Sequence, residues 1–145
     1  MIETVAARIK QAQGEGAAAV RMLAEARVRY PRSRPLLYAH LAALQDAGEN
    51  ARAAEGLAEA VRLHPRDVRL RALQAKSYAA LGKRFLQHQA QAEVYALQGS
   101  VPAAIEQLQL ARRAGDADFY QLSVVDARLR ELRAQHAQEL RDTKK

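Results

Sequence analysis

The chain has 145 residues, 32 of them alanine, with no cysteine, no tryptophan and a formal net charge of +7. This length fits one domain, and the absence of cysteine excludes disulfides and thiolate metal sites. No apolar run is long enough to cross a membrane. The alanine-rich, glycine-poor composition predicts an all-α domain whose core consists mainly of Leu, Val and Ala.

Glycine, proline and capping residues divide the chain into helices. Ser33 and Asp67 are expected N-caps, and the three-residue spacing of Asp118 and Gln121 predicts a capping box. The helices are expected to span about residues 2–13, 17–29, 33–48, 51–63, 67–82, 85–98, 100–115 and 118–138.

Three glycines, Gly14, Gly48 and Gly82, stand 34 residues apart, and the positions that follow them repeat in step. The matching pairs are Ala19 and Ala53, Leu23 and Leu57, Ala26 and Ala60, and Pro31 and Pro65. This period, with small, large apolar, small and proline positions in order, is typical of tetratricopeptide repeats. We therefore expect a right-handed superhelical stack of antiparallel hairpins, with about eight helices.

The period slips by half a repeat after Gly82, because the next glycine of the pattern, Gly99, follows 17 residues later. Ala104, Leu108 and Ala111 then recur at the offsets seen after Gly14. The helix at 85–98 therefore acts as the second helix of one repeat and the first of another. We expect one domain over residues 1–138, with repeats near 1–33, 34–67, 68–100 and 101–138. The third repeat is irregular, and residues 139–145 form a frayed basic tail.

No catalytic or metal-binding motif is found. The four histidines form no H-E-x-x-H pair, and neither a G-x-S-x-G elbow nor a glycine-rich phosphate loop occurs. Asp116 and Asp118 are interpreted as turn and cap residues. The sequence thus predicts a chain that is not an enzyme and needs no cofactor or metal. The positive charge is spread along the chain, which favours solvated helix faces over nucleic-acid binding.

The functional surface is expected on the concave side of the stack, which the first helix of each hairpin lines. The 34-residue register places nine residues on this stripe: Thr4, Arg8, Gln11, Tyr38, Ala42, Gln45, Ala72, Lys76 and Ala79. Arg69 lies at the start of the last part of the stripe. Arg8, Gln11, Tyr38, Gln45, Arg69 and Lys76 are the candidate binding residues. This mildly basic groove suits an extended or helical peptide of acidic character. A carboxylate clamp is not favoured, because no asparagine accompanies Arg8 and Lys76.

The last third of the chain contains a more specific set of runs. These are AEVYALQG at 92–99, PAAIEQLQLA at 102–111, GDADFYQLS at 115–123 and DARLRELR at 126–133. They resemble the C-terminal tetratricopeptide domain of the proteobacterial periplasmic zinc metallopeptidases of the BepA/YfgC type. The resemblance implies a periplasmic, non-catalytic domain that recruits its peptidase to the outer-membrane β-barrel assembly machinery or to stalled barrel substrates. Zinc would belong to the peptidase domain, whose motif is absent from this chain.

Two alternatives stay open. The chain can be a free-standing adaptor of a secretion or pilus assembly system, or its arginine faces can bind nucleic acid or an acidic membrane. Without the family resemblance, a cytoplasmic location is expected. The sequence also leaves open whether the final helix caps the stack or occupies the groove.

Overall fold

The computed structural model describes residues 2–12 and 14–144, and every regular element within them is an α-helix. The eight helices of this part are α1 (Ile2–Ala12), α2 (Gly16–Arg29), α3 (Arg34–Asp46), α4 (Asn50–Leu63), α5 (Val68–Ala80), α6 (Arg84–Leu97), α7 (Val101–Arg113) and α8 (Phe119–Thr143). The all-α prediction is confirmed. The expected end of the first helix at Gln13 lies outside the described residues.

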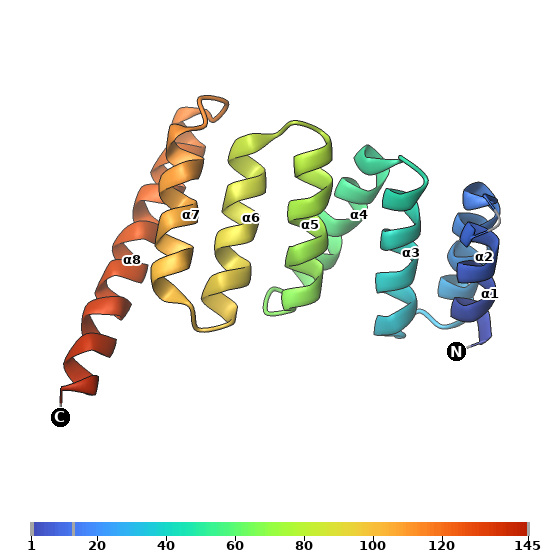
Figure 1. Ribbon diagram of the computed structural model, residues 1–145, viewed down its shortest axis with the longest axis horizontal. Coiled ribbons are helices and arrows are strands. Elements are labelled where there is room, and N and C mark those ends of the chain that lie inside the picture. Colours follow the sequence, from blue (N-terminus) through green and yellow to red (C-terminus); the bar gives the residue numbers. More distant parts are fainter. Residues whose placement is uncertain (1, 13, 145) are drawn as a thin grey trace.

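The helices stack in chain order, with α1 at one end and α8 at the other (Figure 1). Each helix packs against the next, and α3 also contacts both α1 and α5. The first helices of the first three hairpins therefore form a continuous layer. No helix in the described ranges is both long enough and apolar enough to span a bilayer.

The positions that repeat every 34 residues are the positions at which the helices pack against one another. The small and large positions of α2, α4 and α7 are all buried, with exposed fractions of 0 or 1% for Ala19, Ala53, Ala104, Leu23, Leu57 and Leu108. Alanine allows close helix approach, and leucine fills the space that opens beside it. The sequence repeat therefore records a repeated interhelical contact.

The turns explain the half-repeat slip. Gly14, Gly48, Gly82 and Gly99 have φ values of 79, 80, 70 and 81°, a left-handed conformation that glycine adopts without steric cost. Each is followed by an N–H that bonds back to a carbonyl five residues earlier: Glu15 to Lys10, Glu49 to Leu44, Lys83 to Tyr78 and Ser100 to Tyr95. The α6–α7 turn is thus the same turn that joins the two helices of a hairpin. Helix α6 ends one hairpin with α5 and begins another with α7, as the sequence predicted.

Helix α8 closes the stack by packing against α7. Val125, Leu129 and Leu132 are buried in a cluster with Leu108 and with Phe85 of α6. The predicted capping box is present: Asp118 accepts from the Gln121 N–H at 2.7 Å, and the Gln121 side chain accepts from the Asp118 N–H at 3.0 Å. The helix continues to Thr143. The fraying expected of residues 139–145 concerns motion and stays a prediction.

Two long-range contacts fix the α6–α8 end. Asp116, in the turn after α7, accepts the N–H of Phe85 at 3.0 Å and so caps α6 from the far end of the next helix. Arg128 of α8 forms two bonds to the Glu93 carboxylate of α6, at 2.9 and 3.1 Å. Bidentate pairing of this kind sets the orientation of the two helices. Helix α8 therefore caps the stack.

Candidate functional site

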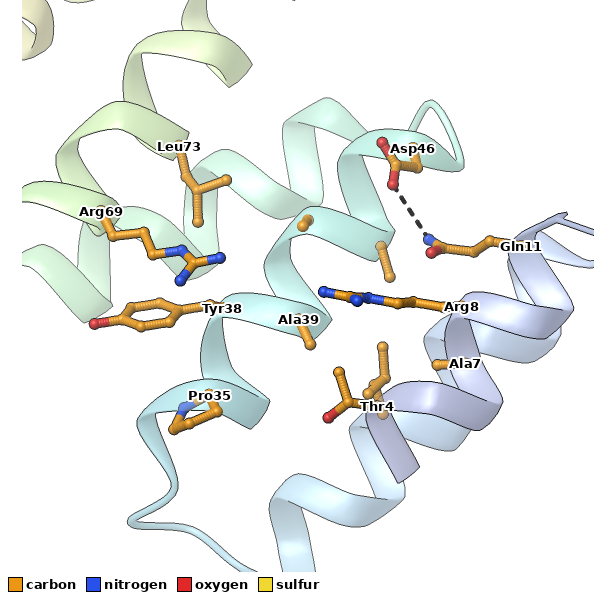
Figure 2. Close-up of a pocket in the computed structure, with 13 residues that line it drawn as sticks. Thr4, Ala7, Arg8, Gln11, Pro35, Tyr38, Ala39, Asp46, Arg69 and Leu73 are labelled. Carbon is orange, nitrogen blue, oxygen red and sulfur yellow. Dashed lines mark hydrogen bonds between the residues drawn. The ribbon is translucent and has the colours of Figure 1, made fainter. Parts of the chain in front are cut away.

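A groove of about 390 Å³ lies between α1, α3 and α5. Its walls carry Arg8 and Gln11 from α1, Tyr38 and Asp46 from α3, and Arg69 from α5 (Figure 2). Alanines of α3 also line the groove, so space is left between the larger side chains around them. We call this the α1/α3/α5 groove.

Local capping sets where α3 and α5 begin, and hence where their groove residues lie. The Ser33 hydroxyl accepts from the Leu36 N–H at 3.3 Å, and the Asp67 carboxylate accepts from the Leu70 N–H at 3.0 Å. Both predicted N-caps are confirmed. Pro35 in the first turn of α3 needs no amide donor, and it also lines the groove. These starts place Tyr38 and Arg69 on facing turns of the two helices.

Arg69 lies over the ring of Tyr38, with its guanidinium carbon 5.0 Å from the ring centroid (Figure 2). This is the geometry of a cation–π contact. The Tyr38 hydroxyl donates a hydrogen bond to Asp67, whose carboxylate also pairs with Arg34 at 2.6 Å. Loss of hydration raises the pKa of Tyr38, and the bond to Asp67 acts in the same direction. Tyr38 is thus a neutral, oriented platform for the Arg69 cation.

Arg8 extends across the opposite wall of the groove (Figure 2). It is exposed, and it forms no ion pair with any residue in the described ranges. Gln11, one turn later, donates to the Asp46 carboxylate of α3 at 3.4 Å. The groove therefore presents two arginines toward its centre and one carboxylate at its rim.

The structure places Gln45 and Lys76 outside the groove. Gln45 is buried, at 7% exposed, and its amide donates to the Leu73 carbonyl at 2.7 Å and to the Ser77 hydroxyl at 2.8 Å. Gln45 therefore fastens α3 to α5. Lys76 is exposed on α5 but does not line the groove. Asp46 and Leu73, which the 34-residue register did not place on the stripe, line the groove.

The side chains of the groove can bind an anionic group. Two guanidinium groups can hold carboxylate oxygens, and each supplies a planar set of N–H donors. The one tyrosine hydroxyl is already committed to Asp67. Within the described ranges no group of three or more His, Asp or Glu side chains is arranged to hold a metal ion.

These features define the protein as an all-α stack of helical hairpins with a basic groove. No protein-family model matches the chain, and no curated protein matches it at a significant level.

Proposed function

We propose that the protein is a non-catalytic scaffold that binds a peptide segment of a partner protein in the α1/α3/α5 groove. The observation that carries this proposal is the pair Arg8 and Arg69. Both cations face one hollow, neither forms an ion pair within the described ranges, and Tyr38 orients one of them. An acidic peptide supplies the missing counter-charges.

The ligand is an extended or helical segment with at least one carboxylate near an apolar side chain. The carboxylate pairs with an arginine in a partly dehydrated hollow, where such bonds are stronger than in water. The apolar group packs against the small side chains of the floor, including Ala39 and Ala42. Asp46 at the rim disfavours a second carboxylate there, so it sets a direction for the peptide.

The test is selection of binders from a random peptide library, followed by fluorescence anisotropy with the selected peptide. Arg69→Ala and Arg8→Ala each weaken binding about tenfold, a loss of about 1.4 kcal/mol, because arginine is among the residues enriched where truncation at an interface costs most. Lys76→Ala is the matched control, a cation on the same helix as Arg69 that does not line the groove. Its affinity stays within about twofold of wild type. Equal losses in all three variants would show that charge alone, and not this groove, holds the peptide.

The resemblance of residues 92–133 to the periplasmic metallopeptidases supports a finer proposal. The chain then recruits a zinc peptidase to β-barrel assembly machinery or to stalled barrel substrates. A genomic reading frame that encodes an H-E-x-x-H motif within a few hundred residues upstream is the expected result. A frame without such a motif rejects the peptidase and leaves a free-standing adaptor of secretion or pilus assembly. Retarded migration of nucleic acid with steep salt dependence would instead favour the arginine faces as a nucleic-acid surface.

A further inference from the structure

A second hollow, of about 280 Å³, lies between α2, the start of α3 and α4. It shares no lining residue with the α1/α3/α5 groove. Three arginines line it: Arg27 from α2, Arg32 from the α2–α3 turn and Arg34 from the first turn of α3. We call it the α2/α4 hollow.

Arg27 is the most unusual of these cations, because it is half-buried and no carboxylate in the described ranges pairs with it. A hydrogen bond joins its Nη1 to Nδ1 of His40 at 3.0 Å. The guanidinium donates, so this nitrogen of His40 is the unprotonated acceptor. Burial lowers the pKa of Arg27. A charge removed from water is costly unless a partner compensates it.

The other charges at the hollow leave a clear positive excess. Arg32 is exposed and forms no ion pair among the described residues, while Arg34 pairs with Asp67 and also bonds Nδ1 of His64 at 3.0 Å. The one acidic residue in the lining, Glu59, is held by Arg62 at 2.6 Å. The N-terminus of α3 adds the positive end of its dipole on the same side.

We propose that the α2/α4 hollow binds the phosphate group of a small phosphate ester. A phosphate dianion has enough acceptor oxygens for donors that approach from two helices and a turn, whereas a carboxylate has only two oxygens. The wall beside the arginines is apolar, with Pro31, Leu37 and Leu63 in the lining. That wall covers the organic part of the ester. The α2/α4 hollow is a separate site, because it shares no lining residue with the peptide-binding groove, although α3 contributes to both.

The experiment is calorimetric titration of the full chain with phenyl phosphate and, separately, with inorganic phosphate in chloride buffer. Saturable one-to-one binding is expected, with phenyl phosphate the tighter ligand. Equal affinity of the two ligands would overturn the assignment of an ester, because the apolar wall would then contribute nothing. Failure of both to bind would overturn the site itself.

Arg32→Ala is the informative variant, because this exposed side chain contributes to the hollow and not to the core. It weakens binding about tenfold, the expected loss for one charge-assisted donor. Arg66→Ala is the matched control, since Arg66 occupies the same register position one repeat later and does not line the hollow. Circular dichroism checks that both variants are folded. Equal weakening of binding in the two variants would mean that the net positive charge of the protein, and not the α2/α4 hollow, attracts the ligand, and it would overturn the proposal.

Discussion

Asp67 is the side chain on which both the start of α5 and the geometry of the groove depend. Its side chain is only 6% exposed, and it accepts hydrogen bonds from the Leu70 N–H, from Tyr38 and from Arg34. We predict that Asp67→Ala destabilises the protein and also loosens Tyr38 in the α1/α3/α5 groove. Peptide affinity then falls although no groove residue has changed.

The magnitude follows from the three contacts of Asp67. Loss of an N-cap costs about 1 kcal/mol. Loss of the charged hydrogen bond to Tyr38 costs about 1 kcal/mol more, at the low end of the range, because water can reach the freed hydroxyl. The Arg34 side chain is 43% exposed, so its pair with Asp67 is screened by water and adds little. The sum of the other two contacts, about 2 kcal/mol, lowers the Tm by about 4–8 °C for a chain of this length.

The assay is thermal unfolding followed by circular dichroism, with Asp67→Asn and Glu59→Ala as comparisons. Asparagine keeps the cap but removes the charge, so it loses less than alanine does. Glu59 forms an exposed pair with Arg62, so Glu59→Ala changes the Tm by little more than 1 °C. If Asp67→Ala destabilises no more than Glu59→Ala, the reasoning about this network is refuted.

The pH dependence separates the charge of Asp67 from its cap. Burial raises the pKa of Asp67, but hydrogen bonds from Tyr38, the Leu70 N–H and Arg34 outweigh burial and lower it below its ordinary value. The unfolded chain therefore takes up the proton first. This stabilisation is complete above about pH 4, near the ordinary pKa of Asp, and is lost as the pH falls toward the lower folded pKa. Asp67→Asn removes this part of the acid sensitivity.

Two further predictions concern single residues. Gly99→Ala destabilises the protein by about 1 kcal/mol, because the φ of Gly99 is +81° and no neighbouring atom is near enough for the added methyl group to pack against. Gly16→Ala is the control in the same thermal unfolding experiment, and it is neutral or stabilising because its Cβ would lie 3.6 Å from Ala47. Burial, and then Arg27 and Arg52, lower the pKa of His40, so unfolding free energy decreases as the pH drops below about 6.5. Denaturant titrations at pH 7.5 and 5.5 measure this decrease, and an equal decrease in His40→Gln would contradict its assignment to His40.

The helix ends and caps could be predicted because they depend on neighbours in the chain. Ser33, Asp67 and Asp118 all cap as expected, and the turn at Gly99 follows from its spacing alone. The cap that Asp116 provides for α6 could not be predicted in this way, because its donor, Phe85, lies 31 residues earlier in the chain. That contact exists only once α7 has folded back along α6.

The groove was predicted in part. Arg8, Tyr38 and Arg69 face it as expected, but on α3 the groove is lined by Asp46 and not by Gln45. One residue is about 100° of rotation around a helix, so a small turn of α3 against its neighbours exchanges a buried side chain for an exposed one. A repeat register fixes spacing along the helices and leaves this rotation open.

The sequence by itself determined the class of fold, the number of helices, the hairpin turns and the half-repeat slip at Gly99. Each of these depends on local backbone preference or on a repeated contact between consecutive helices, and both leave a periodic trace in the residues. Only the tertiary structure decided which polar side chains contact one another. It placed the Arg69 guanidinium over the ring of Tyr38, and it left Arg27 half-buried with a hydrogen bond to Nδ1 of His40. Such contacts depend on the rotation of each helix and on the distances between hairpins, and the repeat pattern of the sequence specifies neither.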